Sequence, residues 1–227
     1  MSDSSKPNYT RSFIVVTSLF FMWGFITVLV DSLIPRLKEI FELSYFEAGL
    51  VQFAFFMAYG LLSIPSGFIL ARIGYKKGML LGLATMGIGC LLFWPAAQLR
   101  VFEIFLLGYF VLAGGMTILQ VAANPYVSVL GEERTASSRL NLSQAFNSVG
   151  TTIAPVIGAM FILSDNIYTG TEISGLTEAE KLSYYASEAS AVQGPFVVLA
   201  LCLLALAGLV AIAKLPKVLD TKHAGSY

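Results

Sequence analysis

Long apolar runs separated by short polar segments dominate this chain. Each run is near or above the roughly 20 residues that an α-helix needs to cross a bilayer. The pattern predicts six spans, at residues 12–34, 48–71, 78–98, 102–129, 139–164 and 193–213. Backbone groups in lipid must be satisfied within the spanning segment. We therefore predict an all-α membrane protein with six transmembrane helices, embedded in a lipid bilayer.

The polar segments divide the chain into a tail (1–11), a helical bundle (12–214) and a last segment (215–227) that is either a second tail or the start of a linker. The longest connection, 165–191, carries five carboxylates against one lysine. We interpret it as a solvated outer loop rather than a binding element. A short surface helix fits within it, because Thr177 and Glu180 have the spacing of a capping box.

Lysine and arginine residues are distributed unevenly between the two sides of the predicted bundle. The side with both termini and the connections after the second and fourth spans has ten, and the other side has four. Cytoplasmic segments carry the excess of these residues. We expect a multi-pass protein of the inner cell membrane with both termini in the cytoplasm.

Composition narrows the possible functions. Hydrophobic residues make up 56% of the chain and charged residues 12%, about half the charged share of a typical soluble domain. The formal net charge is zero, so nothing points to nucleic acid as a partner. The single histidine, His223, lies in the tail, which argues against a histidine base or a zinc cluster. We expect no enzyme, no metal site and no cofactor.

Four amide side chains lie inside apolar runs where a bilayer offers no water. Gln120 and Asn124 have i, i+4 spacing, and Gln144 and Asn147 have i, i+3 spacing, so each pair shares one helix face. The connection at 131–138 is short, so the two helices run antiparallel. Counting outward from it places Gln120 level with Asn147, and Asn124 level with Gln144. The amides could hydrogen-bond between helices, at about 0.6 kcal/mol each, or bind a ligand rich in hydroxyl groups.

Asp31 is the only carboxylate well inside a predicted span. At 1.5 Å per residue it lies roughly 27 Å along its helix, nearer the outer surface than the midplane. It is either an interfacial residue, with Pro35 just beyond it, or a carboxylate that exchanges a proton or pairs with a cation.

Several segments resemble one family of transporters. They are FFMWGFITVLVDSLIPRLKEIFELSYFEAGLVQFAFF, SIPSGFILARIGYKKG, GGMTILQVAANPYVSVLG and SRLNLSQAFNSVGTTIAP. Together they resemble the major facilitator superfamily, and within it the fucose/glucose/galactose permease group of sugar–cation symporters. The resemblance implies a monosaccharide substrate, such as glucose or galactose, and coupling to a proton or sodium ion.

The resemblance also suggests roles for individual residues. Asp31 matches a functional aspartate in the first span of the proton-coupled fucose members. The position of their functional glutamate reads Gln120 here, as in the hexose-transporting branch. Amides matching Gln144 and Asn147 lie near the sugar in family members, which supports a sugar-binding role for the cluster with Asn124. One or two of the 29 aromatic residues could stack on the sugar, but the sequence does not say which.

Members of this family have twelve spans in two six-helix halves, with the substrate between them. The six spans found here match the amino-terminal half. The resemblance therefore implies half of a secondary active transporter, which works by alternating access with a separate C-terminal half or a second copy. Six is an even number, so two copies could meet about an axis normal to the membrane. The alternative is a non-transporting fragment, or a membrane module for assembly or regulation.

Overall fold

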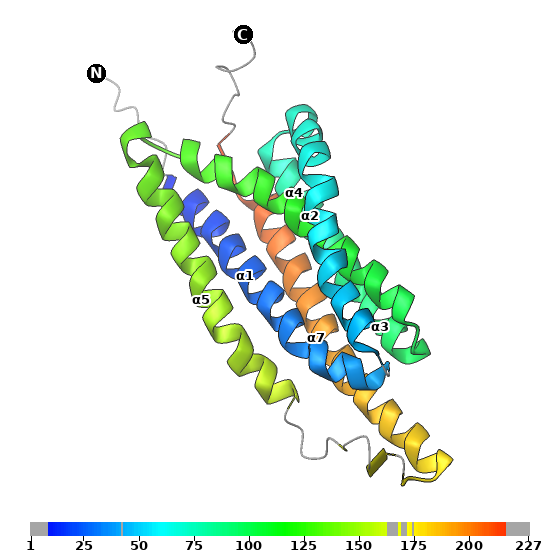
Figure 1. Cartoon of the computed structure of the whole chain (residues 1–227). Helices are drawn as coiled ribbons and strands as arrows, with labels where there is room; N and C mark the ends of the chain where they lie inside the picture. The colour runs from blue at the N-terminus through cyan, green and yellow to red at the C-terminus, as the bar shows by residue number, and fades with distance from the viewer. Residues whose placement is uncertain (1–8, 42, 163–167, 169–171, 174, 217–227) are drawn as a thin grey trace, which may run out of the picture.

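Six long helices lie alongside one another in the protein (Figure 1). A computed structural model describes residues 9–41, 43–162, 168, 172, 173 and 175–216. The helices are α1 (Tyr9–Ile40), α2 (Tyr45–Ile73), α3 (Tyr75–Leu99), α4 (Phe102–Val129), α5 (Ala136–Ile162) and α7 (Glu178–Ile212), and a single 3-10 turn, η1 (Glu133–Thr135), precedes α5. Each long helix overlaps one predicted span. No strand occurs in the described part of the chain. The all-α fold is confirmed.

Five of these helices are long and apolar enough to cross a membrane: α2, α3, α4, residues 9–32 of α1 and residues 193–212 of α7. The helix α5 coincides with the predicted span 139–164 and has 27 residues, yet within the described residues it does not reach the same apolarity. The reason is a concentration of amide and hydroxyl side chains between residues 137 and 152, namely Ser137, Ser138, Asn141, Ser143, Gln144, Asn147, Ser148, Thr151 and Thr152. The most polar of the six helices is thus the one that carries two of the candidate site residues.

The capping box at the start of α7 is confirmed, but the helix after it is not short. The Thr177 hydroxyl accepts from the Glu180 backbone N–H, and the Glu180 carboxylate accepts from the Thr177 backbone N–H. Residues 178–193 contain good helix formers and no glycine or proline. The helix therefore continues without a break into the last span, and α7 has 35 residues in all. The prediction of a short, separate surface helix was wrong, because this segment is the first part of α7. Residues 165–167, 169–171 and 174 of the predicted outer loop, and residues 1–8 and 217–227 of the two tails, lie outside the described residues.

Close helix contacts depend on glycine. A Cβ atom on Gly82 of α3 would lie 2.8 Å from the Gly115 carbonyl oxygen of α4, and one on Gly115 would lie 2.5 Å from the Met86 nitrogen. Both distances are shorter than carbon atoms tolerate, so glycine lets these backbones approach each other. The helix α3 also packs on α7, while α1 packs mainly on α5 and α2 on α4.

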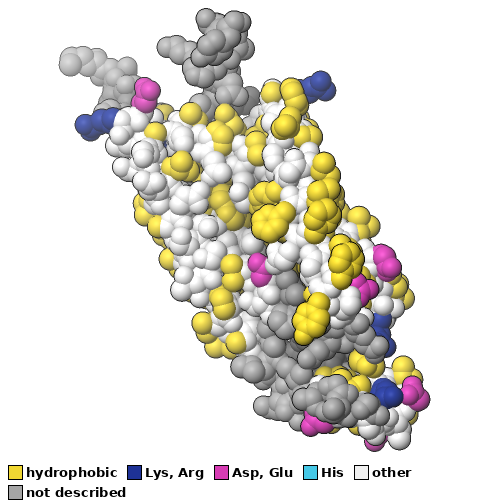
Figure 2. All heavy atoms as spheres, in the orientation of Figure 1, with side chains coloured by type: hydrophobic (Ala, Val, Ile, Leu, Met, Phe, Trp, Pro, Cys, Tyr) yellow, Lys and Arg dark blue, Asp and Glu magenta, His cyan; other side chains and the backbone are white. Residues whose placement is uncertain are grey.

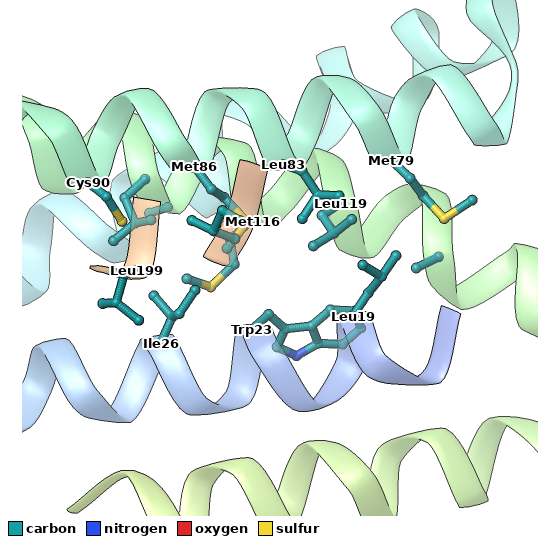
Figure 3. Packing of buried hydrophobic residues seen from close by; sticks show 14 of the residues in the cluster. Leu19, Trp23, Ile26, Met79, Leu83, Met86, Cys90, Met116, Leu119 and Leu199 are labelled. Atoms are coloured by element: carbon teal, nitrogen blue, oxygen red, sulfur yellow. The ribbon is translucent and has the colours of Figure 1, made fainter. Parts of the chain in front are cut away.

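The buried core lies between α1, α3, α4 and α7 (Figure 3). Side chains that face one another there are Leu19, Trp23, Ile26, Met79, Leu83, Met86, Cys90, Met116, Leu119 and Leu199. By contrast, α2 buries few of its side chains and exposes large apolar ones such as Phe53, Phe56 and Phe68. Figure 2 shows hydrophobic side chains spread along this face. Such a surface suits lipid or a second membrane unit rather than water.

Candidate functional site

Asp31 of α1 joins three helices. Its Oδ1 accepts a hydrogen bond from Gln52 Nε2 of α2 at 3.0 Å and another from the Tyr109 hydroxyl of α4 at 2.9 Å. The Asp31 side chain is half-buried, whereas the Tyr109 ring is almost fully buried. Among the described residues, Gln52 and Tyr109 are the side chains that hydrogen-bond to Asp31, and both use Oδ1; a carboxylate Oδ2 can accept a proton or a cation. A carboxylate that only met the membrane surface would not be held this way by two neighbouring helices.

Three of the four predicted amides meet partners on α2, α4 or α5. Gln120 Nε2 donates to the Tyr59 hydroxyl of α2 at 2.7 Å. Gln144 Nε2 of α5 donates to Asn124 Oδ1 of α4 at 3.4 Å. Asn124 and Gln144 are one of the two pairs that counting from the α4–α5 connection placed at equal depth.

Asn147 of α5 forms a hydrogen bond to the backbone of α1. Its Nδ2 donates to the Phe20 carbonyl oxygen at 3.0 Å. A Cβ on Gly24 of α1 would lie 2.5 Å from the Asn147 carbonyl oxygen, and one on Gly150 of α5 would overlap the Phe21 carbonyl oxygen. Two glycines thus bring the helices close enough for the Asn147 amide to reach the backbone of α1. This contact supports the interpretation of Asn147 as a link between helices, and it leaves Oδ1 available for other partners.

Two open hollows surround the Tyr59–Gln120 pair. The first, of about 320 Å³, is lined by α1, α2, α4 and α5 through Trp23, Gly24, Thr27, Phe55, Phe56, Tyr59, Gln120, Asn147 and Thr151. The second, of about 290 Å³, is lined by α2 and α4 through Tyr59, Ser63, Thr117, Gln120, Val121, Asn124 and Pro125. Gln120 and Asn147, predicted at equal depth, line the same hollow. Of the four amides, Gln144 lines neither hollow and is connected to the second one through its hydrogen bond to Asn124.

Aromatic side chains connect the Asp31 contact to these hollows. The Tyr109 ring lies 5.5 Å from the Phe55 ring, and Phe55 lies 4.9 Å from the Tyr59 ring, measured between centroids. Tyr59 then accepts the hydrogen bond from Gln120. Along α1, Thr27 of the first hollow lies one helical turn before Asp31. The carboxylate and the amides therefore belong to one continuous group of packed side chains.

Sequence reasoning missed Gln52, Tyr109 and the role of Tyr59. A signal existed for Gln52, which is the only amide in α2 and lies between Val51 and Phe53. No such signal marks Tyr109 or Tyr59, because tyrosine is common in membrane helices. The Tyr109 hydroxyl reaches Asp31 because α4 lies beside α1, and the Tyr59 hydroxyl reaches Gln120 because α2 packs against α4.

Comparison with known proteins identifies relatives along nearly the whole chain. The chain is 50% identical over 221 residues to a glucose/galactose transporter of Brucella abortus, a match that covers 97% of this chain and 50% of that protein. It is 38% identical over 217 residues to the L-fucose-proton symporter of Escherichia coli K12, covering 95% of this chain and 50% of the symporter. The chain spans about half the length of the curated relatives it matches, and it corresponds to their amino-terminal half.

Solved structures give the same result. The crystal structure of a variant of the Escherichia coli fucose:proton symporter superposes with a TM-score of 0.81 at 36% identity, over 92% of this chain and 50% of that one. A transporter crystal structure in the outward conformation gives a TM-score of 0.84, also at 36% identity, over 96% of this chain and 53% of that one. Residues 12–220 match the family model of the Major Facilitator Superfamily. The chain therefore belongs to the Major Facilitator Superfamily and is a multi-pass membrane protein of that family.

Proposed function

We propose that the chain forms the amino-terminal half of a hexose transporter of the glucose/galactose type, driven by a proton or sodium gradient across the inner membrane. Two facts support the choice of sugar. Identity is higher to the glucose/galactose transporter, at 50%, than to the fucose symporter, at 38%. Gln120 also stands where the resemblance to proton-coupled fucose members leads one to expect a glutamate. Orientation with both termini in the cytoplasm follows from the excess of lysine and arginine at that end of the bundle.

The observation that carries this proposal is the composition of the first hollow. Its walls are Trp23 and the rings of α2, and its polar groups are the amides of Gln120 and Asn147 with two threonine hydroxyls. Small-ligand sites combine apolar walls with a few placed polar groups in this manner. A sugar offers C–H faces to the rings and hydroxyl groups to the amides, each of which both donates and accepts. In this proposal Asn124 and Gln144 supply further hydroxyl partners beside the second hollow.

Asp31 is the proposed coupling site. In the charged state its Oδ1 holds Gln52 of α2 and Tyr109 of α4 through charge-assisted hydrogen bonds, which are about twice as strong as neutral ones. A proton or cation that arrives at Oδ2 neutralises the carboxylate and weakens both bonds. The link between α1, α2 and α4 then loosens beside the sugar hollow. Ion binding and the arrangement of the sugar site are thereby connected through the same three helices.

A second six-helix unit completes the proposed transporter. Both hollows are open, and superfamily halves enclose the substrate between them and rock about it. The second unit is either a C-terminal half or another copy of this chain.

The coupling role is tested with Asp31→Asn in proteoliposomes that contain the assembled transporter. We expect loss of gradient-driven glucose or galactose accumulation, while exchange of labelled sugar across the membrane persists. Glu103→Gln is the matched control, because Glu103 is an exposed carboxylate of α4 with no hydrogen bond or ion pair to another described side chain. Accumulation that survives Asp31→Asn unchanged would refute the coupling role.

The sugar-binding role has a separate test. Glucose and galactose should raise the melting temperature of the purified chain with its second unit more than fucose does. Gln120→Leu should remove most of this stabilisation, since it deletes an amide shared by both hollows. Equal stabilisation of the variant and the parent would show that the hollows do not bind the sugar.

A further inference from the structure

A third hollow lies far from the sugar site, where α1 begins and α7 ends. Both helix ends are at the same end of the bundle (Figure 1). The hollow measures about 650 Å³ and is lined by Arg11, Ser12, Ile14, Val15, Leu209, Ile212, Ala213 and Lys214. It is larger than either hollow beside Gln120. Nothing in the proposed transport mechanism uses it.

The lining divides into a cationic end and an apolar wall. Arg11 and Lys214 are exposed, and the structure gives neither of them an acidic partner among the described residues. One turn deeper, Ile14, Leu209 and Ile212 are 62%, 57% and 83% exposed. Lysine and arginine therefore stand at the bundle end, while apolar side chains continue toward the membrane interior. This gradient matches an amphiphile with an anionic head and hydrocarbon chains.

Helix ends add to the positive potential. Arg11 lies in the first turn of α1, where the backbone N–H groups and the helix dipole favour an anion. The carbonyl end of α7, by contrast, carries partial negative charge and would disfavour an anion. Lys76 of α3 occupies that end, because its Nζ donates to the carbonyl oxygens of Ala211 at 2.8 Å and Ala213 at 2.9 Å. The hollow thus has two side-chain cations and a helix N-terminus, with the negative helix end beside it already neutralised.

We propose that this hollow binds an anionic phospholipid, with the phosphate between Arg11 and Lys214 and an acyl chain along Ile14, Leu209 and Ile212. Basic hollows between membrane helices at the cytoplasmic surface suit anionic lipid headgroups. The apolar wall separates this ligand from free inorganic phosphate, which could use the cations alone. The site is independent of the sugar hollows and would stand even if the chain bound no sugar.

The test is a lipid titration of the full chain in detergent, read as thermal stabilisation and by native mass spectrometry. Dioleoyl phosphatidylglycerol should stabilise the chain and remain bound, whereas dioleoyl phosphatidylcholine and inorganic phosphate should not. Arg11→Gln with Lys214→Gln should weaken binding of the anionic lipid roughly 25-fold, which corresponds to about 2 kcal/mol. The matched control, Arg72→Gln with Lys77→Gln, removes the same charge from the exposed α2–α3 turn and should bind as the parent does.

A charge-conserving pair, Arg11→Lys with Lys214→Arg, should retain binding and shows whether the hollow tolerates substitution. Three results would overturn the proposal: equal weakening in the control pair, equal stabilisation by the zwitterionic lipid, or full stabilisation by inorganic phosphate alone. The first would indicate general surface charge, the second nonspecific coverage of apolar surface, and the third a free-anion site.

Discussion

Replacing Gly24 by alanine should force α1 and α5 apart at the sugar hollow. The new Cβ would lie 2.5 Å from the Asn147 carbonyl oxygen, where ordinary contact begins near 3.4 Å. The helices must therefore separate by about 0.9 Å, because a backbone oxygen cannot rotate away as a side chain can. The Asn147–Phe20 hydrogen bond lies one turn away on the same face and would be stretched with them.

These contacts give the expected loss in the free energy of unfolding. Overpacking of this kind costs about 1–3 kcal/mol, and a hydrogen bond between membrane helices adds about 0.6 kcal/mol. For a chain of this size the sum lowers the melting temperature by about 3–14 °C. Because Gly24 and Asn147 both line the first hollow, glucose-dependent stabilisation should fall as well.

The assay is thermal unfolding of the purified chain in detergent, with and without sugar. Gly67→Ala is the control, since a Cβ on Gly67 of α2 meets no atom within 4 Å and alanine favours the helix. It should melt at or slightly above the parent temperature. If Gly24→Ala had the same melting temperature as Gly67→Ala, the close approach of α1 and α5 would be refuted.

Two further predictions concern helix ends. Arg139→Gln should lower the melting temperature by several degrees, because the Arg139 guanidinium donates to the Val127 and Ser128 carbonyl oxygens in the last turn of α4 and to the Glu132 carbonyl oxygen beyond it. The exposed Arg134→Gln is the control, and equal effects would contradict this capping role. At the start of α7, hydrogen bonds from the Thr177 hydroxyl and backbone N–H hold the pKa of Glu180 below its ordinary value. A lowered pKa in the folded state means that the cap stabilises above the unfolded value, near 4.3, and is lost as pH falls through the folded value. The difference in melting temperature between the parent and Glu180→Gln should therefore be present at pH 6 and shrink as the pH falls below the unfolded value, and a difference independent of pH would contradict it.

Sequence alone was sufficient where the physics is local to the chain. Apolar runs of bilayer length located the helices, and the spacing from Thr177 to Glu180 located a cap that the structure contains. Counting from the α4–α5 connection also placed Asn124 level with Gln144, because both helices rise by the same distance per residue. The same reasoning failed for the length of α7, since polarity indicated a loop where helix propensity continued the helix.

The candidate site depended on which helices touch, and this is not a local property. Asp31 could be singled out as an intramembrane carboxylate, but its donors come from residues 21 and 78 positions away in the chain. Hydropathy locates the spans, but it does not say that α1 packs on α5 and α2 on α4. Glycines such as Gly24 and Gly150 permit the close backbone contact between α1 and α5. The sequence by itself determined the helices and the polar groups that a membrane must enclose, while only the tertiary structure decided which of those groups meet, because their partners are selected by shape between distant segments.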